Sequence, residues 1–513
     1  MSASEVPNVE ESAQMTNLAE NLIATAEKYP DRTAIRLDSV ALTWAQLRDL
    51  SLAAAGSLRA AGIEPGDRVA LILPNVPAFP ILFFGTLMAG GTVVPMNPLL
   101  KAQEIDYYFS DSGARIAFVW GDFLDEARKG AEGTGTRVVQ SGPMGPAEED
   151  LARAEPLGGA VVRDDSDTAV ILYTSGTTGR PKGAELTHTN LDLNARRCAE
   201  VILQIDADDV IMGCLPLFHV FGLVVGLQAA TASGASLALI PRFDPGKALE
   251  VIEREKVTIF EGVPTMYAAI LHHEKAGSTD TSSLRVCASG GSAMPAEVMR
   301  AFEDTFGCMI LEGYGLSETS PVASFNMPDR ERKPGTIGVA IPGCEMRVVD
   351  LDGKDVPTGE VGEIAIRGDN LMKGYWGKPE ATAEAIPDGW FRTGDLATVD
   401  EEGYFTIVDR KKDMIIRGGM NVYPREVEEV LYQHPDVLEA AVVSVPDELM
   451  GEEVGAAVAF KPGATATLED VQQFVKERIA AYKYPRRLWT LDELPKGPTG
   501  KILRREVKPP TGS

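Results

Sequence analysis

Short apolar runs recur along the first 330 residues, and each is followed by a segment long enough to form a helix. The runs cover 68–74, 80–91 and 116–120, and further runs begin at 168, 235, 257, 284 and 309. Runs that are apolar on both faces are typical of parallel strands covered by helices on each side. The pattern therefore predicts an α/β fold to about residue 330, made of two related doubly wound lobes.

After Pro334 the pattern changes to short alternating runs joined by Asp-Gly, Thr-Gly and Glu-Gly turns. This change predicts a small antiparallel, barrel-like subdomain over 335–410. We expect a large N-terminal domain over 1–410, which contains the two lobes and this subdomain, and a small mobile α+β domain over 411–513. The elements predicted in the small domain are helices at 424–432 and 468–481 and strands at 438–445 and 455–462.

The charge is strongly acidic but unevenly distributed. The 513 residues include 49 Lys and Arg against 75 Asp and Glu, for a net charge of −26. That balance argues against nucleic acid as the main partner, because phosphate backbones require a basic face. Residues 411–513 hold 15 basic and 16 acidic residues, so a nearly neutral small domain is expected to face an acidic body.

The remaining composition favours a cytoplasmic protein. The five cysteines contain no C-x-x-C pair, so neither a disulfide framework nor a zinc ribbon is indicated. The N-terminus is polar and acidic without a secretory signal, and no apolar stretch reaches the 18 residues that a membrane span requires. Peripheral contact with a membrane and the choice between monomer and homodimer stay open.

The most informative stretch is YTSGTTGRPKG at 173–183, which follows a buried run. Its glycines, hydroxyl side chains and Lys182 make a loop rich in hydrogen-bond donors, and such a loop is suited to cradling phosphates. The spacing does not fit a Walker loop, and Lys501 is followed by Ile502 rather than by a hydroxyl residue. The stretch therefore predicts a phosphate site of another class.

This loop resembles that of the adenylate-forming superfamily, which includes acyl-CoA synthetases, luciferases and peptide-synthetase adenylation domains. Further blocks resemble the same family in the same order along the chain. They are LPLFHVFG at 215–222, GYGLSET at 313–319, GWFRTGD at 389–395, VDRKKD at 408–413 and PKGPTGK at 495–501. The resemblance implies a large domain of two α/β lobes and a barrel, followed by a small mobile domain.

The resemblance also implies a two-step reaction. A carboxylate attacks the α-phosphate of ATP to give acyl-AMP and pyrophosphate, and the thiolate of coenzyme A then displaces AMP. Such chemistry needs charge neutralisation, positioning and exclusion of water rather than a protein nucleophile. The catalytic residues it implies are Lys501, Glu318, His219 and Lys182, with Mg²⁺ and ATP as cofactors.

The resemblance assigns nucleotide roles to individual positions. Lys182 is expected on the β- and γ-phosphates, Glu318 with Ser317 on Mg²⁺, and the Tyr314 ring on adenine. Asp395 and Arg410 are expected to bind the ribose hydroxyls, and Lys501 to stabilise the transition state of adenylation. The full expected ATP and AMP set is Thr174, Ser175, Gly176, Thr177, Thr178, Gly179, Lys182, Gly291, Ser292, Ala293, Gly313, Tyr314, Gly315, Ser317, Asp395, Arg410 and Lys501.

The resemblance also assigns roles in domain movement and in binding coenzyme A. Lys412 is expected to be the hinge about which the small domain rotates between the two half-reactions. Gly418 and Gly419, next to Arg417, are expected to border the channel for coenzyme A.

The sequence indicates the class of acid substrate less clearly than it indicates the nucleotide. The expected pocket residues are His219, Gly222, Val263, Gly290, Gly315, Pro321 and Val322. They are apolar or small, and His219 stands where amino-acid-activating relatives carry an acid, which argues against an α-amino acid. Gly313, rather than an arginine, precedes Tyr314, which argues against a malonate-type acid. A medium- or long-chain fatty acid is the first expectation, and an aryl or cinnamic acid is the second.

Other functions share these motifs. An acyl-AMP ligase that loads a carrier protein and a luciferase-like oxygenase would both keep the nucleotide residues. A catalytically silent scaffold is the alternative from a different class, and the joint presence of Lys182, Glu318, Asp395, Arg410 and Lys501 argues against it.

Overall fold

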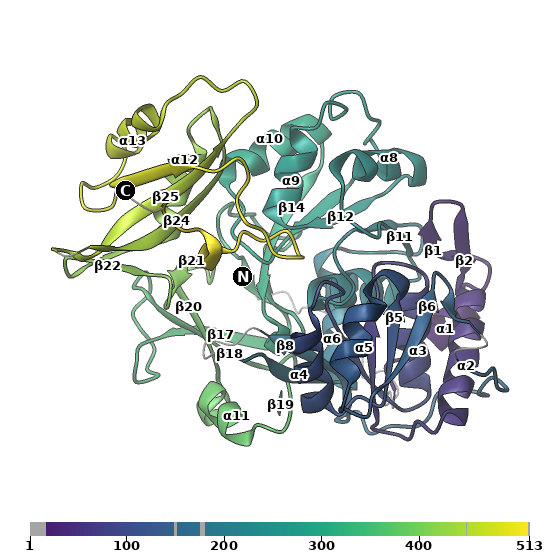
Figure 1. Cartoon of the computed structure of the whole chain (residues 1–513). Helices are drawn as coiled ribbons and strands as arrows, with labels where there is room; N and C mark the ends of the chain where they lie inside the picture. The colour runs from purple at the N-terminus through teal and green to yellow at the C-terminus, as the bar shows by residue number, and fades with distance from the viewer. Residues whose placement is uncertain (1–16, 148–150, 175–179, 448, 511–513) are drawn as a thin grey trace, which may run out of the picture.

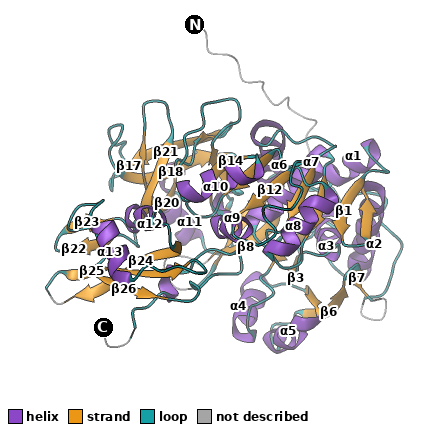
Figure 2. Cartoon of the chain, turned by 90° about the horizontal axis from the view of Figure 1, so that it is seen from above, coloured by secondary structure: helices purple, strands orange, loops and turns teal. Residues whose placement is uncertain are grey.

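The computed structural model describes residues 17–147, 151–174, 180–447 and 449–510. Two large, mainly parallel sheets with helices around them form the body of the molecule (Figure 1). The C-terminal strands lie at one end of the molecule, and α1, α2, β1 and β2 lie at the other (Figure 2). The predicted arrangement of two α/β lobes with a small C-terminal unit is confirmed.

The first sheet has eight strands. Its central five, β8, β4, β3, β5 and β6, run parallel, as the buried apolar runs predict. In order across the sheet the strands are β19 (Gly374–Tyr375), β9 (Lys182–Thr187), β8 (Thr168–Thr174), β4 (Thr92–Pro95), β3 (Arg68–Ile72), β5 (Ile116–Trp120), β6 (Arg137–Gly142) and β7 (Gly145–Pro146).

The second sheet has nine strands, and it includes a segment from the start of the chain. Strand β1 pairs in parallel with β11, so the N-terminal hairpin completes the second lobe rather than the first. In order the strands are β16 (Val339–Ala340), β15 (Val322–Phe325), β14 (Met309–Gly315), β13 (Val286–Ser289), β12 (Ile259–Gly262), β10 (Val210–Gly213), β11 (Ser236–Leu239), β1 (Thr33–Leu37) and β2 (Val40–Thr43).

Helices cover these sheets. The apolar run at 80–91, which shares the character of the strand runs, forms the fully buried helix α3, which packs on α2. The α-helices are α1 (Glu20–Lys28), α2 (Trp44–Ala60), α3 (Ala78–Met88), α4 (Ala102–Ser112), α5 (Leu124–Ala131), α6 (His188–Arg197), α7 (Ala229–Ser233), α8 (Pro245–Glu255), α9 (Pro264–Leu271), α10 (Ala296–Phe306) and α11 (Pro379–Ala385). Helix α6 continues into the π-helix η2 (Cys198–Ile202), the π-helix η3 (Gly222–Gln228) precedes α7, and short 3₁₀ turns are η1 (Gly121–Phe123), η4 (Ser317–Thr319) and η5 (Pro387–Gly389).

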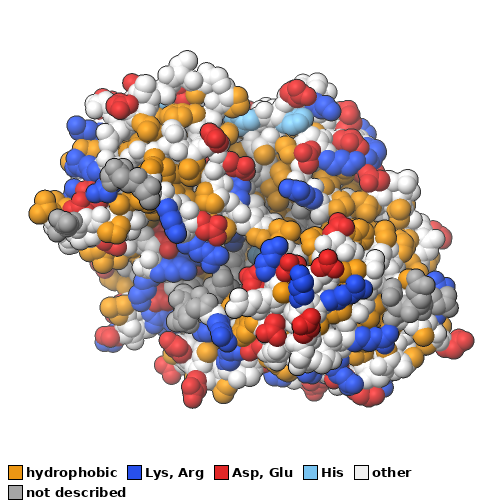
Figure 3. Space-filling model, viewed as in Figure 1, with side chains coloured by type: hydrophobic (Ala, Val, Ile, Leu, Met, Phe, Trp, Pro, Cys, Tyr) orange, Lys and Arg blue, Asp and Glu red, His pale blue; other side chains and the backbone are white. Residues whose placement is uncertain are grey.

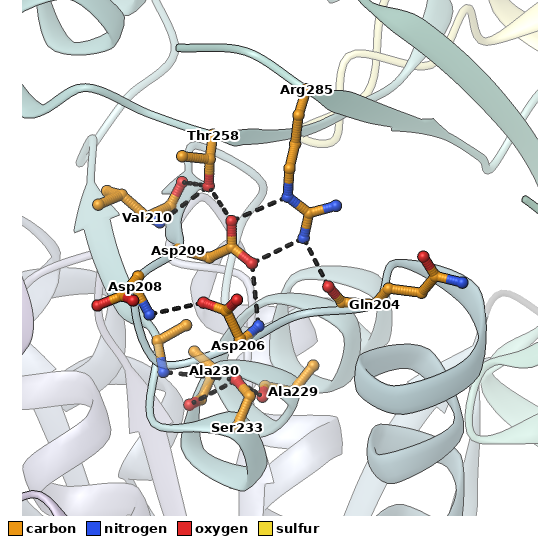
Figure 4. A network of polar contacts seen from close by, with 11 residues as sticks. Gln204, Asp206, Asp208, Asp209, Val210, Ala229, Ala230, Ser233, Thr258 and Arg285 are labelled. Atoms are coloured by element: carbon orange, nitrogen blue, oxygen red, sulfur yellow. Dashed lines mark hydrogen bonds and ion pairs between the residues drawn. The ribbon is translucent and has the colours of Figure 1, made fainter.

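A polar network fastens the amino ends of three strands of the second sheet (Figure 4). Asp209, before β10, accepts hydrogen bonds from Arg285 before β13 at 2.7 and 2.9 Å, and from Thr258 before β12 at 2.6 Å. Arg285 also donates to the Gln204 carbonyl at 2.9 Å. Ligands of open α/β sheets bind at the carboxyl ends of the strands. The network therefore holds the strands at the opposite edge, away from the expected ligand site.

The antiparallel subdomain predicted after Pro334 is confirmed. Its four strands are β17 (Cys344–Val349), β18 (Gly362–Gly368), β20 (Phe391–Val399) and β21 (Phe405–Arg410), hydrogen-bonded in that order. Edge strand β21 also pairs with the segment just before β16, because the Phe405 amide donates to the Gly338 carbonyl and the Ile337 amide donates to the Phe405 carbonyl, both at 2.9 Å. Arg425 of the next unit donates to the Ile407 carbonyl of the same strand at 2.7 Å.

The C-terminal unit has its own sheet and its own core. The sheet order is β23 (Met420–Val422), β22 (Ile415–Arg417), β25 (Gly451–Phe460) and β24 (Val437–Asp447), and β26 (Arg487–Thr490) pairs with β25. Helix α12 (Pro424–Tyr432) matches its prediction, whereas α13 (Leu468–Lys476) is shorter than expected, and the 3₁₀ turn η6 (Arg504–Glu506) lies near the end. Ile407 packs on the first core and Ile415 belongs to the second, and we propose the domain boundary at 410/411 on this basis.

Candidate active site

Two adjoining cavities, of about 410 and 740 Å³, lie where the two lobes, the antiparallel sheet and the C-terminal unit meet. Lys and Arg side chains gather near the centre of this face, below the C-terminal unit (Figure 3). Most of the predicted site residues line one or both cavities. These are Thr174, Lys182, His219, Gly290, Gly291, Ser292, Ala293, Gly313, Tyr314, Gly315, Ser317, Glu318, Pro321, Val322, Asp395, Arg410, Lys412 and Lys501.

The two ends of the predicted phosphate loop are held together by strand pairing. Thr174 at the end of β8 lies opposite Lys182 at the start of β9. Helix α4 braces this region, because the Tyr107 hydroxyl donates to the Pro181 carbonyl at 2.7 Å. The loop residues Ser175, Gly176, Thr177, Thr178 and Gly179 lie outside the described residues.

Glu318 lies on η4 beside this loop. Its Oε1 accepts hydrogen bonds from the Thr174 hydroxyl at 3.2 Å and from the Tyr375 hydroxyl at 2.9 Å. Burial raises the pKa of Glu318, and the bonds from Tyr375 and Thr174 oppose that rise. Lys182 Nζ lies 5.1 Å from the centre of the Tyr375 ring. A carboxylate, two hydroxyl groups and an ammonium are thus brought to one place.

The donor set at Glu318 suits a hard divalent cation, which takes oxygen ligands. Across the described ranges, no three His, Cys, Asp or Glu side chains converge to hold a metal by themselves. A cation here would therefore take most of its ligands from phosphate and water, as Mg²⁺ usually does.

Asp395 and Arg410 form the next part of the site, and the strand register determines it. They face each other across β20 and β21, with Arg410 Nε 3.4 Å from Asp395 Oδ1. The Tyr314 hydroxyl donates to Asp395 Oδ2 at 2.6 Å. Burial raises the pKa of Asp395, and Arg410, Tyr314 and Lys501 oppose that rise.

Lys501 reaches this site from the C-terminal unit. The Thr265 hydroxyl of α9 donates to the Gly500 carbonyl at 2.7 Å, which docks the loop on the second lobe. A Cβ at Gly291 would lie 2.6 Å from Lys501 Cε, so a glycine there makes room for the side chain. Burial, together with the nearby Arg410, lowers the pKa of Lys501 to about 8, against the opposing effect of Asp395.

His219 lies on the same cavity, just before η3. Burial, with a smaller effect of Lys501, lowers its pKa to about 3, so the imidazole is neutral at pH 7. Its Nδ1 accepts a hydrogen bond from the Phe221 amide at 3.3 Å. The neighbouring wall is tight, because a Cβ at Gly290 would lie 3.0 Å from the Phe221 ring.

Four predicted residues are not on these cavity walls. Gly222 starts η3, where a Cβ would lie 2.7 Å from the Pro216 carbonyl oxygen, so close backbone packing explains this glycine. A Cβ at Gly500 would lie 3.1 Å from Val263, which places Val263 under the docked loop. Gly418 and Gly419 form the turn between β22 and β23, with φ of +55° and +82°.

The sequence reasoning missed residues that act through these contacts. Tyr375 of β19 links Glu318 to Lys182, and Arg504 of η6 pairs with Glu428 at 2.5 Å and with Asp409 at 3.0 Å. No local signal marks either residue, because their partners are far away in the sequence.

The basic residues of the C-terminal unit are largely neutralised inside that unit. Lys483 pairs with Glu426 at 2.6 Å, and Lys496 with Glu439 at 2.8 Å. Arg417 makes two bonds to Glu453 at 2.5 and 2.9 Å. The basic residues of this unit on the cavity walls include Lys411, Lys412, Arg425, Lys501, Arg504 and Arg505.

Comparisons with known proteins agree with this arrangement. Residues 22–376 match the AMP-binding enzyme family, and residues 426–501 match the AMP-binding enzyme C-terminal domain. A long-chain-fatty-acid–CoA ligase of Bacillus subtilis (strain 168) is 37% identical, over 95% of this chain and 93% of its own length. A feruloyl-CoA synthase of Amycolatopsis sp is 41% identical, over 95% and 97%. The crystal structure of ATP-bound MatB from Rhodopseudomonas palustris is 34% identical with a TM-score of 0.88, over 95% and 98%.

Matches of this length and identity define the class, an adenylate-forming acid–CoA ligase. The chain belongs to the AMP-binding enzyme family, as its motifs predict. In the part of the chain that the structure describes, no helix is long and apolar enough to cross a bilayer.

Proposed function

We propose that this enzyme binds the tail of a carboxylic acid in an apolar pocket and joins its carboxyl group to AMP, a step that Lys501 stabilises. The enzyme then transfers the acyl group to coenzyme A. The observation that carries the proposal is the convergence of Lys501, Glu318 and Asp395 on one pair of cavities from three separate elements. AMP and pyrophosphate are the other products.

The phosphates of ATP would be held beside Thr174 and Lys182. Glu318, with the Ser317 hydroxyl next to it, would hold Mg²⁺, which neutralises phosphate charge when bound. Tyr375 supports this assignment, since its hydroxyl keeps the Glu318 carboxylate aimed toward Thr174.

Lys501 would place its ammonium between the attacking carboxylate and the α-phosphate. Two anions that repel each other are brought together there, and a nearby fixed positive charge lowers the barrier. The docking of Gly500 on Thr265 supports this role, because it holds the lysine against Gly291 rather than in solvent. Neutral His219 would line the acid side and help to keep water from the acyl-AMP.

The second half-reaction would use a different placement of the C-terminal unit. Lys412 lies between β21 and β22, at the junction of the two cores, which supports its role as the hinge. Rotation there would withdraw Lys501 and bring Gly418 and Gly419 toward the cavity, where backbone alone would border coenzyme A.

For the acid, a medium- or long-chain fatty acid is the first candidate. The cavity wall offers Phe221, Pro321, Val322 and Phe325, and the 37% identical Bacillus relative is named for long-chain fatty acids. An aryl or cinnamic acid is the second candidate, favoured by the narrow contact of Phe221 with Gly290 and by the 41% identical feruloyl-CoA synthase.

A carrier-protein thiol is the alternative acceptor of the acyl group. The five buried, free cysteines fit a reducing compartment, and we place the enzyme in the cytoplasm.

The test is an AMP-release assay with ATP and Mg²⁺, with and without coenzyme A, across fatty, aryl and amino acids. We expect release that depends on both coenzyme A and a fatty or aryl acid. Release with amino acids alone, or release that free coenzyme A does not accelerate, would contradict the proposal.

A further inference from the structure

A buried carboxyl group with one unpartnered oxygen lies inside the second lobe. Glu261, on β12, is 1% exposed, and its Oε1 has no partner among the described residues. Burial alone raises the pKa of Glu261 well above its usual value. Burial therefore favours the neutral form of this acid, which has one O–H donor and one carbonyl acceptor. Nearly all buried polar groups in proteins are paired, so this one calls for an explanation.

Glu261 lies on the strand that leads to the reaction centre. Side chains alternate along a strand, so Glu261 and Val263 point to the same face. Val263 lies under the loop that carries Lys501, since a Cβ at Gly500 would be 3.1 Å from it. Two residues of strand span about 7 Å, so Glu261 lies about that far along β12 from Val263 and the loop that carries Lys501.

That face is the one that η3 covers. A Cβ at Gly226 of η3 would lie 3.4 Å from Glu261 Oε2, so Gly226 brings only backbone to this carboxyl. The residue beside Glu261 on β13 is Ala288, which is also small. Helix η3 follows His219 and Phe221 directly, and those residues line the acid side of the larger cavity. The walls of that cavity include His219, Val220 and Phe221 but no residue of η3, so a tail would approach Glu261 by extending past Phe221 between η3 and the sheet.

We propose that Glu261 recognises a hydroxyl group on the tail of the acid substrate. This inference rests on the proposed function and narrows it. A tail of methylene groups alone would leave Glu261 Oε1 unpaired, whereas a hydroxyl could both donate to and accept from the carboxyl group. The hydroxyl of a hydroxylated aryl acid and that of a hydroxylated fatty acid offer the same chemistry, and the experiment separates the two sources.

The experiment compares acids that differ by one hydroxyl. The pairs are 4-hydroxycinnamate with cinnamate, 4-hydroxybenzoate with benzoate, and 12-hydroxydodecanoate with dodecanoate. We expect the wild-type enzyme to favour the hydroxylated acid at least about 10-fold in kcat/KM in one class of pair, because a site built to bind a hydroxyl rejects the analogue that lacks it. The class of pair that shows the preference identifies the source.

Two substitutions test the residue. Glu261→Leu keeps the size but removes the polar group, and we expect it to abolish the hydroxyl preference while retaining kcat/KM for the unsubstituted acid. Glu261→Gln keeps a donor and an acceptor and should retain most of the preference. Because Glu261→Leu removes an unpaired polar group, its Tm should be equal to or above that of the wild type.

The matched control is Thr86→Val. Thr86 on α3 is also fully buried, and its hydroxyl likewise has no partner among the described residues. We expect it to preserve the hydroxyl preference. The inference is overturned if unsubstituted acids are used as well as their hydroxylated partners, or if Glu261→Leu leaves the preference intact. Lack of turnover with every acid would instead overturn the proposed function itself.

Discussion

The Tyr314 hydroxyl donates a 2.6 Å hydrogen bond to Asp395 Oδ2, and this bond joins β14 of the second lobe to β20 of the antiparallel sheet. Burial raises the pKa of Asp395, and the bond from Tyr314 is one of the effects that oppose the rise. The Tyr314 hydroxyl thus has an effect beyond the stacking on adenine that we propose for its ring. It favours the ionised form of Asp395, the form that would accept hydrogen bonds from ribose hydroxyls in the proposed site.

Tyr314→Phe should move the acid limb of the pH profile. The ring stays but the hydrogen bond is lost, so the pKa of Asp395 rises and the carboxylate is protonated at a higher pH. We expect the acid limb of kcat/KM for ATP to shift upward and KM for ATP to increase at pH 6. Tyr404→Phe is the control, because its hydroxyl donates to the Glu331 carbonyl. An unchanged profile in Tyr314→Phe would show that the hydroxyl does not influence Asp395.

Lys501→Ala should separate the two half-reactions. Without the ammonium, ATP–pyrophosphate exchange should fall by about 100-fold or more, while thioester formation from supplied acyl-AMP largely survives. Lys496→Ala is the matched control in the same loop, since Lys496 pairs with Glu439 and Glu493. Equal loss of both steps would count against the assigned role.

The wild-type pH profile tests Lys501 independently. Burial lowers the pKa of Lys501 to about 8, and the role we propose for Lys501 in adenylation requires its protonated form. Exchange measured as kcat/KM, which reports the free enzyme, should therefore decline as pH rises through about 8. A profile that stays flat to pH 10 would contradict this expectation.

Glu318→Gln should weaken the dependence on Mg²⁺. The amide keeps an oxygen that accepts from Thr174 and Tyr375 but loses the negative charge that binds a divalent cation. We expect a higher Mg²⁺ concentration at half-maximal exchange and a lower maximal rate. Glu345→Gln, an exposed acid paired with Arg367, should change neither value. The assignment fails if both variants titrate with Mg²⁺ as the wild type does.

Lys412→Pro tests the hinge. Proline fixes φ near −65°, so the chain between β21 and β22 would lose the rotation that we propose for the second half-reaction. Acyl-AMP formation should be spared, and transfer to coenzyme A should slow. Lys412→Ala removes the side chain but leaves φ free, and it should transfer normally. Unchanged kinetics of both steps in the proline variant would rule out the hinge.

The strands were predictable where burial is complete and local. Strands β3, β5 and β12 fall inside apolar runs because both of their faces are covered. Pairing between distant segments was not predictable: β1 joins β11 across about 200 residues, and no pattern near residue 35 indicates that partner. The apolar run that forms α3 could have been a strand or a helix, because a helix buried on every side lacks the polar face that would distinguish it.

Some residues of the candidate site were likewise predictable from local sequence, and others were not. Motifs indicated Glu318, Asp395 and Lys501, but not the residues that orient them, because Tyr375 and Thr265 carry no local signal and act through distant partners. Glu261 lies within the apolar run that begins at 257, and only the structure shows that its carboxyl is buried with Oε1 unpartnered.

Arg285→Met should destabilise the second lobe through Asp209. The variant leaves the buried Asp209 carboxylate without the two bonds from the guanidinium. Unpaired buried charge is costly, and because Arg285 is 39% exposed we expect a loss of about 1–3 kcal/mol at pH 7. Arg300→Met removes an exposed pair with Glu297 and should cost less than about 0.5 kcal/mol.

The pH dependence of that loss gives a second readout. The contacts with Arg285 and Thr258 outweigh burial and lower the pKa of Asp209. An acid with a lowered pKa stabilises the fold above its unfolded pKa, and this contribution disappears as pH falls through the folded pKa. The difference in Tm between wild type and Arg285→Met should therefore be largest near neutral pH and shrink in acid. A difference that is constant from pH 7 to pH 3 would show that lost packing, rather than the ion pair, explains the destabilisation.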